Sequence, residues 1–186
     1  ILKHAIEAEK TIFENTSGAD CTVCTYGGII EYDKKQGFKK IENEPNFHLV
    51  IVNSNIKHST ESMVSKVKQF EIENEEEFTK LCDQESKLVK DVLELLKENN
   101  TSEIGEKINQ NQEYLEIIGI SNNELRKMIK MGQKSSFGAK ITGSGGGGCI
   151  FAITNKSNLD KTLKEFKNKN YDCFSVKIDF KGLNTF

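Results

Sequence analysis

The chain has 186 residues, 36% of them hydrophobic and 29% charged, which suits one globular domain or one domain with part of another. Its 26 basic and 28 acidic residues leave a formal net charge of −2. This balance argues against a general nucleic-acid-binding protein, because such proteins usually carry an excess of basic residues. No apolar stretch approaches the roughly 20 residues that span a bilayer, so no membrane partner is expected.

The chain begins at Ile1 without an initiator Met or a signal-peptide pattern, as expected of a piece of a longer protein. The cysteines form an odd, scattered set, which is typical of free thiols in a reducing compartment, so we expect a cytoplasmic protein. Cys21 and Cys24 form a C-x-x-C pair, but no second C-x-x-C pair and no pair of histidines completes a zinc site. The five are Cys21, Cys24, Cys82, Cys149 and Cys173.

The first quarter of the chain is predicted to form a helix followed by two strands. Apolar residues recur at helical spacing over residues 1–14, and the segment 15–18, NTSG, is a turn signal. A strand is predicted over Thr22–Tyr32, with the pair Gly27-Gly28 marking a bulge or a close approach of backbone. A short strand over Phe38–Ile41 is expected to pair with it through a hairpin loop.

The remainder of the chain alternates strands with helices. A continuous apolar run, Phe47–Val52, predicts a central strand, and the run Cys149–Thr154 predicts a second buried strand. Four helices are expected between these strands, and one helix and one strand after them. These elements cover residues 59–70, 75–98, 102–118, 121–132, 157–166 and 173–180, with Ser121 and Ser157 as expected caps. This order predicts an α+β fold with helices packed on one face of a mostly antiparallel sheet.

A glycine-rich segment, KITGSGGGGC, covers Lys140–Cys149. Five of the six residues 143–148 are glycine, a composition that suits bare backbone approaching something closely, most often an anion cradled by N–H groups. The run satisfies G-x-G-x-x-G, but a predicted strand follows it instead of a helix, and no Lys-Ser/Thr closes it. The dinucleotide-binding and P-loop interpretations therefore fail. A flexible linker is the less favoured alternative.

Two acidic residues near the start have a context that suits catalysis. Asp20 follows a glycine turn, where a rigid scaffold positions loop residues, and Glu9 lies eleven residues earlier on the predicted first helix. One such carboxylate can hold Mg²⁺ beside nucleotide phosphates while the other orients or deprotonates a substrate hydroxyl. A solvated surface charge is the alternative for both, and a turn or helix cap is a further alternative for Asp20.

A polar cluster, NSNIKHST, covers Asn53–Thr60 and leads from the predicted central strand into a helix. A helix N-terminus with hydroxyl, Lys and His side chains nearby suits the binding of an anion or a hydroxyl group. Ordinary N-capping explains the same residues equally well. The remaining histidines, His4 and His48, are isolated, and we expect each to be structural.

Together these motifs resemble those of the GHMP kinases, the superfamily of galacto-, homoserine, mevalonate and phosphomevalonate kinases. The glycine-rich segment resembles the family's C-terminal glycine motif. Segments 15–20 and 23–28, NTSGAD and VCTYGG, resemble its N-P-S-G-x-D and the S-T-W/Y-G-G that follows. Asn53–Thr60 resembles N-T-G-x-K-x-S-T, and residues 109–120 resemble its M-N-x-x-x-x-x-L-x-x-L-G-V helix. The combination is most similar to the archaeal-type mevalonate kinases.

The resemblance implies ATP-dependent phosphorylation of the 5-hydroxyl of mevalonate, in isoprenoid biosynthesis, with ATP and Mg²⁺ as cofactors. It implies that Asp20 is the catalytic residue and that Glu9 binds the metal. Phosphoryl transfer relies chiefly on positioning and charge stabilisation, so an acid, a metal and a loop rich in N–H groups are the expected parts. The implied cofactor-binding residues are Gly143, Ser144, Gly145, Gly146 and Gly147, and the implied substrate-binding residues are Ser17, Gly18, Thr142 and Ser144.

Several departures from the family pattern concern this site. Thr16 replaces the usual Pro, Phe13-Glu14 replaces the usual His-Gly, and Ser144 stands where Ala is commoner. The family's main ATP loop, P-x-x-x-G-L-G-S-S, and a reactive N-terminal lysine are not among these residues. We therefore expect the N-terminal part of the same enzyme as a partner, and no turnover by residues 1–186 alone.

The resemblance also implies a division into two parts. Residues 1–45 would be the end of the N-terminal kinase domain, and residues 46–186 the C-terminal α+β domain of ferredoxin-like type. A homodimer is among the expected assemblies. The alternative functions are another GHMP kinase, acting on phosphomevalonate, the 3-hydroxyl of mevalonate, galactose or homoserine, and a non-catalytic binding module with this fold. A degenerate module of that kind should lack Asp20 or Glu9.

Overall fold

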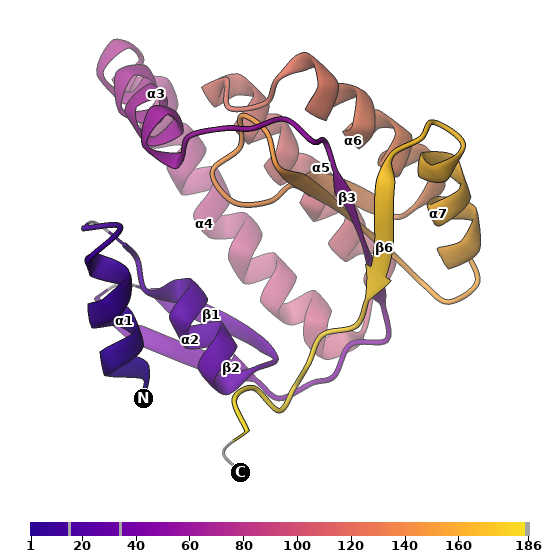
Figure 1. Ribbon diagram of the computed structural model, residues 1–186, viewed down its shortest axis with the longest axis horizontal. Coiled ribbons are helices and arrows are strands. Elements are labelled where there is room, and N and C mark those ends of the chain that lie inside the picture. Colours follow the sequence, from indigo (N-terminus) through magenta and orange to yellow (C-terminus); the bar gives the residue numbers. More distant parts are fainter. Residues whose placement is uncertain (15, 34, 185–186) are drawn as a thin grey trace. The chain divides into compact units, whose positions relative to one another are not determined.

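The computed structural model describes residues 1–14, 16–33 and 35–184. Asn15, which belongs to the predicted turn, and Lys34, which belongs to the predicted hairpin loop, lie outside the described residues. The chain divides into two compact units (Figure 1). The first unit comprises Ile1–Glu44 and Lys177–Phe186, and the second unit comprises Pro45–Val176. None of the helices within the described ranges is long and apolar enough to cross a membrane.

The first unit contains two helices and one antiparallel strand pair, and it corrects one sequence prediction. Its elements are α1 (Leu2–Lys10), α2 (Ala19–Tyr26), β1 (Ile29–Asp33) and β2 (Gly37–Ile41). The predicted hairpin is therefore present, but the first half of the predicted strand Thr22–Tyr32 is the helix α2.

Local contacts explain why a segment rich in β-branched residues forms the helix α2. Gly18 adopts φ 79° and is the N-cap, and the buried hydroxyl of Thr22 donates to the Gly18 carbonyl at 2.7 Å. The strand preference of Thr and Val is weak and yields to such tertiary context. Gly27, at φ 65°, ends the helix, so the glycine pair forms no bulge. The predicted close approach of backbone is confirmed, because a Cβ on Gly27 would lie 2.4 Å from the backbone N of Gly182.

Residues 177–184 group with the first unit, apart from the strand that precedes them. The N–H of Gly28 donates to the Asp179 carbonyl at 2.7 Å, and the N–H of Leu183 donates to the Thr25 carbonyl at 3.1 Å. These two bonds attach the segment to α2 and to the residue that follows its C-cap. The predicted last strand, Cys173–Phe180, ends at Val176.

The second unit contains a four-stranded antiparallel sheet (Figure 1). Its strands are β3 (His48–Asn53), β4 (Gly138–Ile141), β5 (Cys149–Thr154) and β6 (Asp172–Val176), in the order β4-β5-β3-β6. The prediction that the first apolar run forms a central strand is confirmed, because β3 pairs with β5 on one side and β6 on the other. A block of helices joins β3 to β4, and one helix joins β5 to β6, which is the split β-α-β-β-α-β arrangement of ferredoxin-like folds.

Five helices complete the second unit: α3 (Thr60–Glu73), α4 (Glu75–Glu98), α5 (Thr101–Ile118), α6 (Asn123–Ser135) and α7 (Leu159–Lys167). The predicted bounds of α4 are confirmed at both ends. Two predicted caps are wrong. Asn122, not Ser121, caps α6 through Oδ1, which accepts the N–H of Leu125 at 2.9 Å. The hydroxyl of Ser157 donates to Asn155 and makes no cap to α7.

The hydrophobic core lies between one face of the sheet and helices α6 and α7. Alternate residues of the central strands, such as Val50 and Ile150, are fully buried against Leu125, Met128 and Phe166. α6 continues past Gly132 to Ser135, and this glycine packs closely on the sheet: a Cβ there would lie 2.7 Å from the Cβ of Ala139. The predicted α+β class, with helices on a mostly antiparallel sheet, is confirmed.

Helix α5 covers the free edge of β4 with amide side chains. Oδ1 of Asn109 accepts the N–H of Ala139, and Oε1 of Gln112 accepts the N–H of Ile141, both at 3.0 Å. These bonds satisfy edge groups that would otherwise be left without a ladder partner. The approach needs two glycines, since a Cβ on Gly138 would lie 2.1 Å from the Gly105 carbonyl oxygen.

Gln112→Met is expected to lower the free energy of unfolding by about 1–3 kcal/mol, because it leaves the buried N–H of Ile141 without an acceptor at similar side-chain volume. Gln112 is 1% exposed, so water does not replace the lost bond. The matched control is Gln110→Met on the exposed surface of the same helix, where little change is expected. Urea unfolding of both variants measures the difference, and equal stabilities would contradict the account of this edge.

Candidate active site

The turn before α2 positions Asp20 in the first unit. Gly18 is left-handed at φ 79°, and a Cβ there would lie 3.0 Å from Cδ1 of Ile6, so glycine suits both the angle and the space. The hydroxyl of Tyr32 donates to the Ser17 carbonyl, and the Ser17 hydroxyl accepts the N–H of Ala19 at 3.2 Å. Asp20 consequently lies exposed in the first helical turn, where the helix dipole favours an anionic side chain.

Glu9 lies on the last turn of α1 and is directed to the same turn. Its Oε2 accepts hydrogen bonds from the hydroxyl of Thr16 at 2.6 Å and from the thiol of Cys21 at 3.5 Å. Partial desolvation, with the hydrogen bond to Glu9 and the charge of Glu9 next, raises the pKa of the Cys21 thiol, so the thiol stays protonated as a donor. The structure therefore brings the predicted metal residue to the segment that carries Ser17, Gly18 and Asp20.

The glycine loop of residues 143–148 lies in the second unit and joins β4 to β5. Four of its glycines have positive φ, between 66° and 79°. A Cβ on Gly145 would lie 2.5 Å from the Ile120 carbonyl oxygen, and one on Gly147 would lie 2.4 Å from that of Ile56. Gly143 has open space where a Cβ would be. Gly145 and Gly147 therefore run against other backbone, whereas a Cβ on Gly146 or Gly148 would meet the side chain of Met63 or His58.

The polar cluster Asn53–Thr60 lies against this loop. The Gly148 N–H donates to the Ile56 carbonyl at 3.0 Å, and the Gly148 carbonyl accepts the N–H of Ser54 at 2.9 Å. The hydroxyl of Ser144 is 3.4 Å from that of Thr60, the first residue of α3. Ser59 caps α3 by accepting the N–H of Ser62, so the N-capping interpretation is confirmed, and the N-terminus of α3 lies beside the loop.

Two anchoring residues of the loop were not predicted as site residues. The N–H of Gly146 donates to the Ile120 carbonyl at 2.7 Å, and Nδ2 of Asn122 donates to the Gly146 carbonyl at 3.0 Å. In the sequence, Ile120 could have been found from the Gly-Ile pair that ends the motif of residues 109–120, and Asn122 from its place at the cap of α6. Within the described ranges, the N–H groups of Ser144, Gly145 and Gly147 have no hydrogen-bond acceptor.

A half-buried cation lies on the strand that leads into the loop. Desolvation lowers the pKa of Lys140 on β4, and the charge of Glu85 opposes this shift. Glu85 of α4 is also held by Asn111 of α5, whose Nδ2 donates to Oε2 of Glu85 at 2.6 Å. The bond between Asn111 and Glu85 links α5 to α4, and the charge of Glu85 acts on Lys140 of β4.

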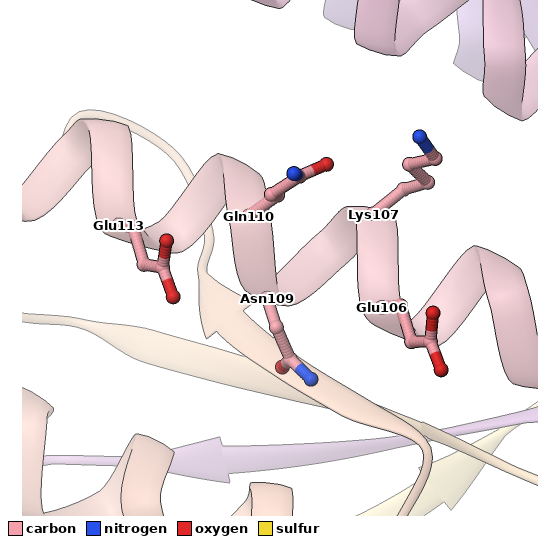
Figure 2. Close-up of a pocket in the computed structure, with 5 residues that line it drawn as sticks. All are labelled: Glu106, Lys107, Asn109, Gln110 and Glu113. Atoms are coloured by element: carbon pink, nitrogen blue, oxygen red, sulfur yellow. The ribbon is translucent and has the colours of Figure 1, made fainter.

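A shallow polar hollow of about 280 Å³ lies along α5 and contains none of the predicted site residues (Figure 2). In the close-up Asn109 points toward the sheet, whereas Lys107 and Gln110 point away from it. Asn109 holds β4, and Lys107 pairs with Asp91 at 2.7 Å. Asn109 and Lys107 of this hollow thus serve the fold. Its lining residues are Glu106, Lys107, Asn109, Gln110 and Glu113.

Comparisons with known proteins support the resemblance to the GHMP kinases. Residues 92–173 match the family described as GHMP kinases C terminal. The mevalonate kinase of Methanocaldococcus jannaschii is 32% identical over 184 residues, which cover 96% of this chain and 56% of that protein. That of Arabidopsis thaliana is 25% identical over 188 residues, or 97% of this chain and 50% of that protein. The chain thus spans about half the length of the curated relatives it matches.

A solved structure extends the match to three dimensions. The crystal structure of the Methanococcus jannaschii mevalonate kinase superposes with a TM-score of 0.85 at 27% identity, covering 96% of this chain and 55% of that chain. The predicted family is confirmed by these matches together. Residues 92–173 match the GHMP kinase C-terminal family, and along nearly its whole length the chain is similar to mevalonate kinases.

Proposed function

We propose that the chain supplies one part of an ATP-dependent kinase that phosphorylates the 5-hydroxyl of mevalonate. The observation that carries the proposal is the local geometry of the first unit, in which Asp20 lies in the first turn of α2 and the Glu9 carboxylate is bonded to the same segment. The mevalonate kinases among the relatives support the substrate. A solved relative with 28% identity and a TM-score of 0.81 is the L. major mevalonate kinase in complex with R-mevalonate.

In this proposal the two carboxylates have separate roles. Asp20 accepts the proton of the attacking hydroxyl, and Ser17 and Gly18 position the substrate beside it. Glu9 offers hard carboxylate oxygens, which suit Mg²⁺ held by one or two carboxylates together with substrate phosphates. Within the described ranges no cluster of three or more His, Cys, Asp or Glu residues forms a metal cage, which agrees with that shared mode of binding. When bound, Mg²⁺ neutralises charge on the phosphates.

The glycine loop is proposed to bind the ATP phosphates through backbone N–H groups. Those of Ser144, Gly145 and Gly147 are the donors, whereas Gly146 donates to Ile120 and contributes only close-fitting backbone. Gly143 and Thr142 lie exposed at the start of the loop, and we assign Thr142 and the Ser144 hydroxyl to substrate contact. Backbone donors fixed before the reaction stabilise developing charge without reorganisation.

The other partners are also proposals. The family's main ATP loop is not among these 186 residues, so we propose that turnover requires the N-terminal part of the same enzyme. The pathway would be isoprenoid biosynthesis, in the cytoplasm. Relatives that act on other substrates, such as the homoserine kinase from Cytophaga hutchinsonii at 19% identity, share the fold only.

The test is an ADP-release assay with the protein at its full natural length. Mevalonate, phosphomevalonate, galactose and homoserine are offered in turn as phosphoryl acceptors. The proposal expects saturable release with mevalonate and only background release with the other three. If another acceptor is used preferentially, that compound replaces mevalonate as the proposed substrate. If none of the four acceptors stimulates ADP release, the kinase assignment is contradicted.

A further inference from the structure

Thr16 connects the metal-binding candidate to the catalytic turn through its hydroxyl. This hydroxyl accepts the N–H of Gly18 at 3.1 Å and donates to Oε2 of Glu9 at 2.6 Å. The donor in the first bond and the acceptor in the second are both fixed, so the hydroxyl hydrogen has one direction. The chain of bonds runs from the glycine that caps α2 to the carboxylate at the end of α1.

We propose that Thr16 is a positioning residue for Glu9, which holds the carboxylate in the orientation that binds the divalent cation. The proposal rests on the proposed function, because it takes Glu9 as the metal ligand. It is a property of this chain, since a proline at this place, as in the pattern the chain resembles, has no hydroxyl to offer.

The geometry leaves one carboxylate oxygen of Glu9 for the metal. Oε2 receives both Thr16 and Cys21 as donors, and among the described residues no donor bonds to Oε1. A carboxylate has about four acceptor positions, so Oε1 keeps its lone pairs for a cation. Hydrogen bonds to an ionised acceptor are roughly twice as strong as neutral ones, which limits the rotation of the carboxylate. Glu9 is half-buried, so water competes only partly for these bonds.

A merely structural role for Thr16, as a cap of the turn, would make a different prediction. In that case loss of the hydroxyl would lower stability without changing metal affinity in the folded protein. Outer-sphere partners that orient metal ligands typically contribute about 10–100-fold in metal affinity. Metal affinity measured directly, with unfolding measured in parallel, separates the two roles.

The experiment measures Mn²⁺ binding by electron paramagnetic resonance, as a probe for Mg²⁺, with the protein at full natural length and saturated with a non-hydrolysable ATP analogue. Thr16→Val is expected to raise the Kd of Mn²⁺ about tenfold. Thr16→Ser should stay within about twofold of wild type, because serine retains both hydrogen bonds. The matched control is Thr11→Val, since the Thr11 hydroxyl donates only to the exposed Ala8 carbonyl.

Glu9→Gln separates failure of this inference from failure of the proposed function. If Glu9→Gln weakens Mn²⁺ binding and Thr16→Val does not, Thr16 has no positioning role, and the assignment of Glu9 stands. If Glu9→Gln binds Mn²⁺ as wild type does, Glu9 is not the ligand and both claims fail. Should Thr16→Val not fold, Thr16→Ala replaces it with the same expected rise in Kd, and an unchanged Kd there overturns the inference.

Discussion

Asp20→Asn is expected to lower kcat by about 10²–10⁴-fold, because an amide cannot accept the proton of the attacking hydroxyl. The substitution keeps the side-chain shape, and Asp20 is exposed in the first turn of α2, so the fold should be retained. The KM for ATP should change much less than kcat, since the lost interaction belongs to the transition state. ADP release at full natural length, with mevalonate as acceptor, measures both constants.

The control for this variant is Asp83→Asn, which removes an exposed carboxylate from α4 in the second unit. It should leave both constants unchanged. A folded Asp20→Asn protein with near-wild-type kcat would show that this carboxylate is not the base. Circular dichroism of both variants confirms that any loss of rate is not a loss of structure.

Gly145→Ala is expected to lower the free energy of unfolding by about 2–4 kcal/mol and to weaken ATP binding. The residue has φ +79°, and its new Cβ would lie 2.5 Å from the Ile120 carbonyl oxygen, which is backbone and cannot rotate away. The loop must shift to relieve the overlap, and the shift breaks the bond from the Gly146 N–H to that same oxygen.

Gly143→Ala is the matched control, because it has φ +66° but nothing within 4 Å of the added Cβ. It carries only the left-handed backbone cost of about 1–2 kcal/mol. Urea unfolding with ATP titration of both variants isolates the effect of the close approach. Equal losses in the two would mean that backbone angle, and not the fit of the loop against Ile120, explains the glycines.

Sequence patterns predicted the elements whose own periodicity specifies them. The apolar three-and-four spacing of Glu75–Glu98 and the apolar run Cys149–Thr154 gave the observed bounds of α4 and β5. The helix α2 was missed because Thr22 and Val23 favour strands by propensity, while the helix depends on the Gly18 turn held by Tyr32. The attachment of residues 177–184 to the first unit could likewise not be predicted from the sequence, since it depends on backbone hydrogen bonds between distant segments.

For the candidate site, composition indicated that bare backbone was needed but not where its N–H groups would go. The bonds of Gly146 and Gly148 to Ile120 and Ile56 depend on how α5 and β3 end, and no local pattern encodes them. Thr16 appeared in the sequence only as a departure from a familiar motif. Its bond to Glu9 exists because α1 and α2 pack together. Such contacts between elements are tertiary and leave no periodic signal.

Transfer of the γ-phosphoryl group to mevalonate, followed by phosphorus NMR with the protein at full natural length, tests the proposed reaction most directly. Esterification of the primary 5-hydroxyl places the phosphorus next to a methylene group, so the account predicts a phosphate monoester signal split into a triplet by two protons. A singlet would mean transfer to the tertiary 3-hydroxyl, and no ester signal while ADP forms would mean hydrolysis. Either result would contradict the assignment of Asp20, Glu9 and the glycine loop to a mevalonate 5-kinase.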